Sequence, residues 1–499
     1  MDVIEKLQED LRTGRIDANR LVDLIGILQH ELQAAKQRIA ELEKQVAGPS
    51  GPAKVDQPFS MRAEEKRQEA RGKKRRKRKD KGRRGRVCTA DKVAQAERTE
   101  EVYPDGVPQS DCWLSHTRPV WRLEQGRAVL VAYRVYRGPN NQYGKIPGVL
   151  GRSEFALEIV VAIAFQVYVV GLSFDKVCLL LHFFQNLKLR KSQADALLHQ
   201  LARHWHKEFD VLCTLMANSL VVHTDETSWS LNSVWAFLSE KARLLLFGVH
   251  KDAATLEALL DPATFAGIVI SDDAAVYGNF TQAQKCWAHL LRKAIKLTLQ
   301  DANNADYRQF TDRLLAIYRE ACRVQRDGRL ADAGRARKVA GLEKEILALC
   351  GAMWFADLPP LEGPANDYRL LVNEIMRLMV AKELFTFVTA QPVEQPNGEI
   401  QPVGGTNNES ERTLRNPATA RKTGRTSKTM HGARRQTIVT SVLESLRLYL
   451  RTFTLANVID EVQGWLETGR SCFEDLLEKL GLPLSPQSIL DEVLPPPSG

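Results

Sequence analysis

The centre of this 499-residue chain holds four short strand-like runs, and their order limits the folds that the chain can adopt. From residue 153 to about 215 the apolar residues recur with a helical period, and in the section that follows they recur with the period of strands. In chain order we predict strands at 219–225, 233–238 and 242–249, a helix at 252–260, a strand at 267–272 and a helix at 284–296. This order predicts a mixed α/β domain.

Acidic residues end two of these strands. Asp225 closes the first strand and Asp272 closes the fourth. The β-β-β-α-β-α order is that of the ribonuclease-H-like fold, and by analogy we expect the two aspartates to face each other on neighbouring strands. Strand alternation turns Glu226 to the opposite face, and it lets only one of Asp272 and Asp273 face Asp225. His223 shares the face of Asp225; we interpret it as a satisfied core histidine, with a place beside the site as the alternative.

A third acidic segment lies much later in the chain. On a helix, Glu409 and Glu411 lie about 200° apart, so they compete for one role. Arg415 follows Glu411 by four residues and could pair with it or hold a phosphate. Three carboxylates could surround two Mg²⁺ ions about 4 Å apart, which activate a water or 3′-hydroxyl and stabilise the leaving oxygen of a phosphodiester. The hypothesis is an enzyme that cuts and joins DNA; turn aspartates and surface ion pairs are the alternatives.

The N-terminal segment has apolar residues in a seven-residue repeat. Leu21 and Leu28 belong to one series and Ile25 and Ile39 to another, offset by four positions, over nearly four heptads. This pattern predicts a coiled coil over 1–47, with isoleucine and leucine placed as in parallel dimers. A single amphipathic helix that packs on its own protein is the alternative.

The net charge of +9 is unevenly distributed. The segment 61–86 has a net charge of +11, and the segment 412–435 has a net charge of +8 with no acidic residue. Two basic segments on an otherwise acidic chain indicate a polyanionic partner. The run 71–86 cannot form a core, so we predict that it is disordered when free and adds salt-dependent affinity for DNA. A solubilising linker is the alternative.

These patterns together predict eight segments. They are a coiled coil at 1–47, a basic disordered linker at 48–102, a small β-rich module at 103–151, a helical, helix-turn-helix-like DNA-binding region at 152–216, the first part of the catalytic domain at 217–300, a helical insertion at 301–400, the end of the catalytic domain at 401–455, and a C-terminal helical region and tail at 456–499. Within the helical region, Ser173 is expected to cap a helix that ends at Phe184. A plain helical hairpin accounts for the pattern equally well.

Cysteine spacing and hydropathy indicate the cellular compartment in which we expect the protein. No two of the eight cysteines lie in a C-x₂₋₄-C spacing, so we expect no Cys-pair zinc site and reduced thiols. The longest uncharged apolar stretch, 159–174, is short for a membrane span and predicts a core helix. We expect a cytoplasmic protein without a membrane partner.

Three segments resemble the bacterial DDE transposases of the insertion-sequence-sixty-six type. His223-Thr224-Asp225-Glu226-Thr227 is similar to the family's His-Ala-Asp-Glu-Thr segment. Asp272, five residues before Tyr277, and Trp287-Ala288-His289-Leu290-Leu291-Arg292 are similar to its Asp-Gly-Tyr-x-x-Tyr segment and the Trp-Ala-His-x-x-Arg helix that follows. The run from Asn407 to Arg415 is similar to its Asp-Asn-Asn-x-x-Glu-Arg-x-x-Arg segment. Asp273-Ala274 and Thr406 depart from these patterns and mark a divergent member.

The resemblance implies a role for each acid. It selects Asp225, Asp272 and Glu411 as the catalytic residues and the ligands of two Mg²⁺ ions, for which Mn²⁺ can substitute. The implied fold class is multidomain α + α/β, with a coiled coil, a helical DNA-binding region and a ribonuclease-H-like catalytic domain that carries a helical insertion. No structural zinc is expected, because Cys88 and Cys112 lack partners where the family has a small Cys-pair zinc module.

The implied function is DNA transposition: cutting transposon ends and joining the 3′-hydroxyls to target DNA. Two alternatives are a catalytically silent DNA-binding regulator derived from a transposase and a ribonuclease-H-like nuclease without joining activity. Expected partners are DNA, a second copy of the chain through the coiled coil, and accessory transposition proteins; when bound to DNA the protein would be nucleoid-associated. The residues expected to hold DNA are Arg71, Lys73, Lys74, Arg75, Arg76, Lys77, Arg78, Lys79, Arg412, Arg415, Arg421, Lys422, Arg425, Lys428, Arg434 and Arg435.

Overall fold

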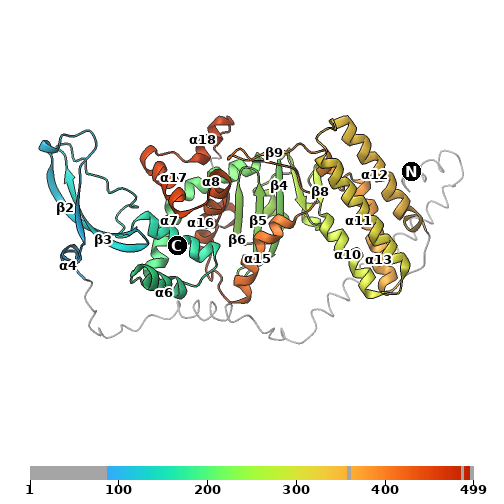
Figure 1. The fold of residues 1–499 in the computed structure, drawn as a ribbon, viewed down its shortest axis with the longest axis horizontal. Coiled ribbons are helices and arrows are strands. Elements are labelled where there is room, and N and C mark those ends of the chain that lie inside the picture. The colour runs from blue at the N-terminus through green and yellow to red at the C-terminus, as the bar shows by residue number, and fades with distance from the viewer. Residues whose placement is uncertain (1–86, 357–360, 485–487, 495–499) are drawn as a thin grey trace, which may run out of the picture. The chain divides into compact units, whose positions relative to one another are not determined.

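A computed structural model describes residues 87–356, 361–484 and 488–494, all within a compact unit that spans Arg71–Gly499 (Figure 1). The predicted coiled coil at 1–47 and the basic run at 71–86 lie outside the described residues, and so do Arg71 to Lys79.

The first described segment forms a three-stranded sheet. Its elements are α4 (Thr89–Ala94), β1 (Arg98–Val102), a 3₁₀ turn (Gln109–Asp111), β2 (Trp113–Glu124) and β3 (Arg127–Arg137). The strand order is β1-β3-β2, and the β2–β3 hairpin turns at Gln125 and Gly126, which both have positive φ as a two-residue type I′ turn requires. The β-rich module therefore begins before residue 103. The prediction of a disordered linker was wrong over 89–102, because β1 gains its order by pairing with β3, which is distant in the chain.

Helices follow the sheet, as predicted. They are α5 (Leu157–Ala164), a π-helical turn (Phe165–Val169), α6 (Phe174–Gln185), α7 (Lys191–His204) and α8 (His206–Ala217). Ser173 caps α6 by accepting a hydrogen bond from the amide of Lys176. The first half of the apolar stretch 159–174 forms most of α5, in which nearly every residue is buried. Among the helices of the described ranges, none is long and apolar enough to cross a membrane.

The central sheet has five strands. They are β4 (Val221–Ser228), β5 (Ser233–Ser239), β6 (Arg243–Val249), β7 (Ile268–Ser271) and β8 (Ala283–Lys285), with α9 (Ala253–Glu257) and a 3₁₀ turn (Ala275–Tyr277) between them. The order is β6-β5-β4-β7-β8; β4, β5 and β6 are antiparallel, and β7 and β8 run parallel to β4. The first and fourth strands are neighbours, as predicted.

One strand of this sheet escaped prediction. The helix predicted for 284–296 begins only at Trp287, and the residues before it form β8. The three residues of β8 are Ala, Gln and Lys, which have low strand propensity. They form a strand because β7 pairs with them and because Gln284 binds the backbone of Leu384 through its side chain.

A helical segment separates the sheet from the acidic segment near residue 411. It comprises α10 (Trp287–Gln300), α11 (Ala305–Arg326), α12 (Asp332–Trp354), α13 (Gly363–Val380), α14 (Thr386–Thr389) and the short strands β9 (Val393–Glu394) and β10 (Ile400–Gln401). The long helices α10 to α13 lie side by side next to β8 (Figure 1). Their apolar core includes Val221 and Ile270 of the sheet, so the segment is packed against the sheet as one core.

The remaining helices return to the sheet. They are α15 (Asn408–Lys422), α16 (Met430–Tyr449), α17 (Leu455–Thr468), α18 (Cys472–Lys479) and α19 (Ile489–Val493). Helix α15 packs on β4 and β5, and α16 packs on the edge strand β6. These contacts place two distant segments of the chain on the same sheet.

Helix α16 covers the free edge of β6 with hydroxyl groups. Ser445, Ser441 and Thr437 are spaced by four residues and form one row on the helix. They accept hydrogen bonds from the amides of Arg243, Leu245 and Phe247, at 2.9, 3.0 and 2.9 Å respectively. Amides that point away from β5 thereby gain partners, and the edge is protected from pairing with another chain.

We expect Ser441→Ala to lower the free energy of unfolding by about 1–3 kcal/mol, because the amide of Leu245 is then buried without a partner. Chemical denaturation measures the change. Thr440→Val is the matched control: the Thr440 hydroxyl is buried on the same helix without a hydrogen bond, so its removal should cost little or nothing. Equal losses in the two variants would contradict the role of this hydroxyl row.

Candidate active site

Parallel pairing brings the two predicted aspartates to one rim of the sheet. The register of β4 and β7 matches Val221 with Ile268 and His223 with Ile270. Two residues beyond the last matched pair, the strands lead to Asp225 and Asp272. Asp272 directly follows β7, but Asp225 does not end its strand as predicted, because pairing with β5 continues β4 to Ser228. Asp225 therefore lies within β4, beside the end of β7.

Asn407 fastens α15 to this rim. Its side-chain amide donates a hydrogen bond to the carbonyl oxygen of Thr224 at 2.8 Å, and its side-chain oxygen accepts one from the Ser410 hydroxyl. Its backbone amide donates to Cys286 Sγ at 3.1 Å. Asn407 is fully buried, so these bonds form in a low-dielectric setting where each is costly to lose. Glu411 follows one turn later and is thereby held near Asp225.

The pKa of the Asp225 carboxyl depends on its burial and on the nearby acids. Burial raises the pKa of its carboxyl to about 7, and the neighbouring charges of Glu226, Asp272 and Glu411 act in the same direction. The hydrogen bond from the amide of Glu226 opposes the shift. A carboxyl whose pKa is raised by burial and by other acids is typical of functional sites.

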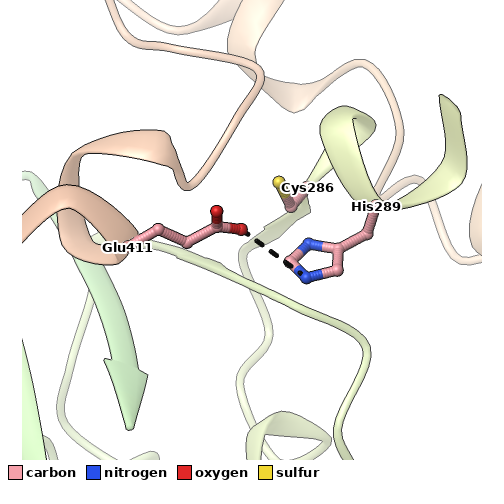
Figure 2. Close-up of side chains that lie close together, drawn as sticks. All are labelled: Cys286, His289 and Glu411. Carbon is pink, nitrogen blue, oxygen red and sulfur yellow. Dashed lines mark ion pairs between the residues drawn. The ribbon is translucent and has the colours of Figure 1, made fainter. Parts of the chain in front are cut away.

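Glu411 has partners on α10. Its Oε1 lies 2.5 Å from Arg292 Nη2 and 3.6 Å from His289 Nε2. Figure 2 shows His289 and Cys286 directed toward Glu411 from the start of α10, with Glu411 reaching them from α15. One ligand atom from each of these three residues lies within 4.8 Å of the other two.

The neighbouring acids that sequence left as competitors are engaged elsewhere. Glu409 lies 2.7 Å from Arg243 on β6, and Asp273 forms an ion pair with Arg377 on α13. Glu226 is buried; it accepts a hydrogen bond from the hydroxyl of Tyr277 and lies 2.7 Å from Lys251 Nζ.

His223 is not the fully satisfied core histidine that we expected. Its Nδ1 is buried without a hydrogen-bond partner in the described part of the chain, and burial lowers the pKa of its ring. The ring lines a cavity of about 250 Å³ that Arg243, Glu409 and Arg412 also line. The sequence could not show this, because residues on β6 and α15 form the cavity's other walls.

The basic residues of 412–435 fall into two groups. Arg412, Arg415 and Lys422 are exposed on α15 and form no ion pair within the described ranges. The others are bonded within the protein: Arg421 donates to the carbonyl of Ser228, Arg425 to the carbonyl of Gly171, Lys428 to the Thr426 hydroxyl, Arg434 to the carbonyls of Leu490 and Leu494 and to Asp491, and Arg435 to Tyr168 and Asp195.

Two of the bonded arginines make contacts that stabilise the fold. Arg435 is buried between Tyr168 and Asp195, and Arg434 caps the carbonyls at the end of α19. Their positions correct the expectation that they hold DNA phosphates, because neither guanidinium is available without breaking these contacts.

The family of the chain follows from a comparison with family models. The model of the Transposase IS66 family matches residues 152–435, which is more than half of the chain. The chain therefore belongs to the IS66 family of transposases. No curated protein matches it. Membership implies a DNA-processing enzyme that binds DNA.

Three residues beside the acids had no role in the predicted site. Asn407 and Arg292 lie in segments that resemble the family, and Cys286 directly precedes one of them, but spacing alone did not show that Arg292 contacts Glu411 or that Asn407 contacts Cys286. The sequence did contain the two motifs that hold or adjoin these residues, Trp-Ala-His-x-x-Arg and Asn-Asn-x-x-Glu. It could not show that the two motifs contact each other, because that contact forms only in the folded chain.

The raised pKa of Asp225 predicts a pH-dependent stability of the metal-free protein. The folded state holds the Asp225 proton more tightly than the unfolded state, whose pKa is near 3.8, so stability falls as pH rises from about 4 to 7. Asp225→Asn removes this cost, and at pH 8 in EDTA we expect it to stabilise the protein by up to about 4 kcal/mol, with little effect near pH 4. Thermal unfolding at both pH values measures the difference.

The control for this prediction is Asp273→Asn. Asp273 is the next acid in the chain, but it is paired with Arg377, so its replacement removes an attraction and should not stabilise the protein at pH 8. An equal effect of Asp225→Asn at pH 8 and near pH 4 would contradict the electrostatic cause.

Proposed function

We propose that the protein is a DNA transposase that cuts the ends of its own element and joins the freed 3′-hydroxyls to target DNA. Asp225, Asp272 and Glu411 are the proposed catalytic acids. The observation that most supports the proposal is the β4–β7 register, which leads to Asp225 and Asp272 side by side. The raised pKa of Asp225, caused first by burial and then by Glu226, Asp272 and Glu411, adds support. The strand order of the central sheet supports a ribonuclease-H-like catalytic domain.

The three carboxylates fit a pair of hard divalent cations. Mg²⁺ prefers oxygen ligands and usually keeps several waters, so three carboxylates are a suitable protein contribution. When bound, two Mg²⁺ or Mn²⁺ ions supply activation of the attacking oxygen and stabilisation of the leaving oxygen. No salt bridge forms at Asp225 within the described residues, so a cation there would relieve the repulsion among the acids.

The residues around the acids have proposed positioning roles. Asn407 fixes the start of α15 and therefore the approach of Glu411 to Asp225. Arg292 pairs with Glu411 in the metal-free protein, and its side chain is 54% exposed, so it can turn toward solvent or a DNA phosphate when the carboxylate takes a metal. Lys251 balances the charge of the buried Glu226 on the other face of β4.

DNA is proposed to follow the exposed basic residues. Arg412, Arg415 and Lys422 on α15 lie in the same helix as Glu411 and would hold the backbone near the acids. The basic run 71–79 would add sequence-independent affinity, and the helical region 152–216 would recognise the terminal repeats. The coiled coil at 1–47 is proposed to join two copies of the chain, and accessory proteins are proposed partners.

The decisive experiment is strand transfer with DNA that carries the ends of the element's own locus. Wild type with Mg²⁺ should yield joined products, and Asp225→Asn and Glu411→Gln should each lose at least about 100-fold in cleavage while they still bind the ends, because each removes several kcal/mol of transition-state stabilisation. Glu409→Gln is the matched control: it lies on the same helix but pairs with Arg243, so cleavage should persist.

Each alternative gives a different result in this assay. Retained cleavage in Asp225→Asn would refute the proposed site. Cut ends without joined products would support a nuclease. End binding without cutting in wild type and variants alike, also with the proteins encoded beside it, would support a silent regulator.

We also expect Arg415→Ala to weaken the binding of DNA of any sequence and to reduce the slope of log K against log salt by about 1, because one phosphate contact releases about one counterion. Filter binding or fluorescence anisotropy over a range of salt concentrations measures the slope. The matched control is Arg329→Ala, since Arg329 is exposed on the helical insertion and paired with Asp327. Equal slopes for wild type and Arg415→Ala would place the phosphate contact elsewhere.

A further inference from the structure

Two residues beside Glu411 have no role in an all-oxygen metal site. Cys286 precedes α10 as its N-cap, and His289 lies in the first turn of that helix. Together with Glu411 they form a cluster in which one ligand atom from each residue lies within 4.8 Å of the other two (Figure 2). The cluster offers one sulfur, one nitrogen and one oxygen.

This set of donors suits a different cation from Mg²⁺. Thiolate and imidazole are ligands of Zn²⁺ and of similar borderline-soft ions, whereas Mg²⁺ takes oxygen. In a tetrahedral zinc site with bonds of about 2.0–2.3 Å, the ligand atoms lie roughly 3.3–3.6 Å apart. His289 Nε2 and Glu411 Oε1 are 3.6 Å apart, which is already close to that spacing.

The surroundings of the cluster favour a bound cation in two further ways. The Nδ1 atom of His289 is buried without a hydrogen-bond partner in the described part of the chain, so no internal bond fixes the ring away from a metal. All eight cysteines, each within the described residues, are free thiols, and Cys286 Sγ accepts a hydrogen bond of 3.1 Å from the Asn407 amide, which holds the sulfur beside the start of α15. A thiolate and a carboxylate together would neutralise a divalent ion.

Arg292 is the basic group that opposes this site most directly. Its guanidinium lies 2.5 Å from Glu411 Oε1 and would repel a cation bound there. Its side chain is 54% exposed, so it can leave the carboxylate for solvent at the small cost of a surface ion pair. A cation bound by three protein ligands would exceed that cost.

We propose that Cys286, His289 and Glu411 form a binding site for Zn²⁺ or a similar thiophilic divalent ion, with water in the fourth position. Binding displaces the thiol proton of Cys286 to solvent. A second consequence rests on the proposed function: because Glu411 cannot serve both sites, zinc occupancy removes it from the Mg²⁺ site and inhibits cleavage.

Titration of the purified protein with Co²⁺ tests the site without DNA. A tetrahedral Co²⁺ ion bound to a thiolate gives a sulfur-to-metal charge-transfer band and strong visible bands. We expect both from wild type, loss of the charge-transfer band in Cys286→Ser, and at least about tenfold weaker binding in His289→Asn. Cys88→Ser, which alters an exposed thiol at the start of α4, is the matched control and should leave the spectrum unchanged.

Two results would overturn the zinc site. One is a charge-transfer band of equal strength in wild type and Cys286→Ser; the other is no such band in a wild type that unfolds cooperatively. Thermal unfolding of each variant shows whether it is folded, and His289→Asn keeps the test valid if Cys286→Ser is not.

A competition assay separates this site from the proposed function. Zn²⁺ should inhibit Mg²⁺-dependent cleavage by wild type, and at least about tenfold more Zn²⁺ should be needed with His289→Asn. Asp225→Asn should lose cleavage yet retain the Co²⁺ spectrum. A Co²⁺ spectrum together with cleavage that Asp225→Asn retains would refute the catalytic site alone, whereas Zn²⁺ inhibition that is equal in wild type and His289→Asn would refute the regulatory consequence alone.

Discussion

Parallel pairing of β4 with β7 is the interaction on which the candidate site depends. It places Asp225 and Asp272 at the same rim, although β5, β6 and α9 separate them in the chain. The third acid reaches that rim through Asn407, whose side chain bonds to the backbone of β4 rather than to another side chain. A backbone acceptor in a strand cannot move independently, so the start of α15 is held as firmly as the sheet itself.

The charges around the rim are unevenly compensated. Glu409, Asp273 and Glu226 each have a basic partner. Asp225 has none within the described residues; burial, together with the charges of its acidic neighbours, raises its pKa to about 7. Glu411 also has a basic partner, Arg292, so within the described residues Asp225 and Asp272 are the acids of the rim that no ion pair compensates. The divalent cations of the proposed function would remove part of the repulsion between these acids.

The helical insertion takes part in building the site. Its apolar core is continuous with one face of the sheet, and Trp287 joins the two: its ring is fully buried and its indole nitrogen donates to the carbonyl of Leu384 at 2.7 Å. This contact fixes the start of α10. The positions of His289 and Arg292 relative to Glu411 therefore depend on residues about 100 positions later in the chain.

Sequence determined the features that local patterns encode. The strands β4 to β7, the cap at Ser173 and the separation of Glu409 from Glu411 follow from periodicity and from the chemistry of single residues. The tertiary structure decided what depends on contacts between distant segments. It made a strand of Ala283–Lys285, ordered β1, turned Arg435 inward and brought Cys286 to Glu411. Local sequence propensity cannot predict these features, because each is stabilised by a partner that is distant in the chain.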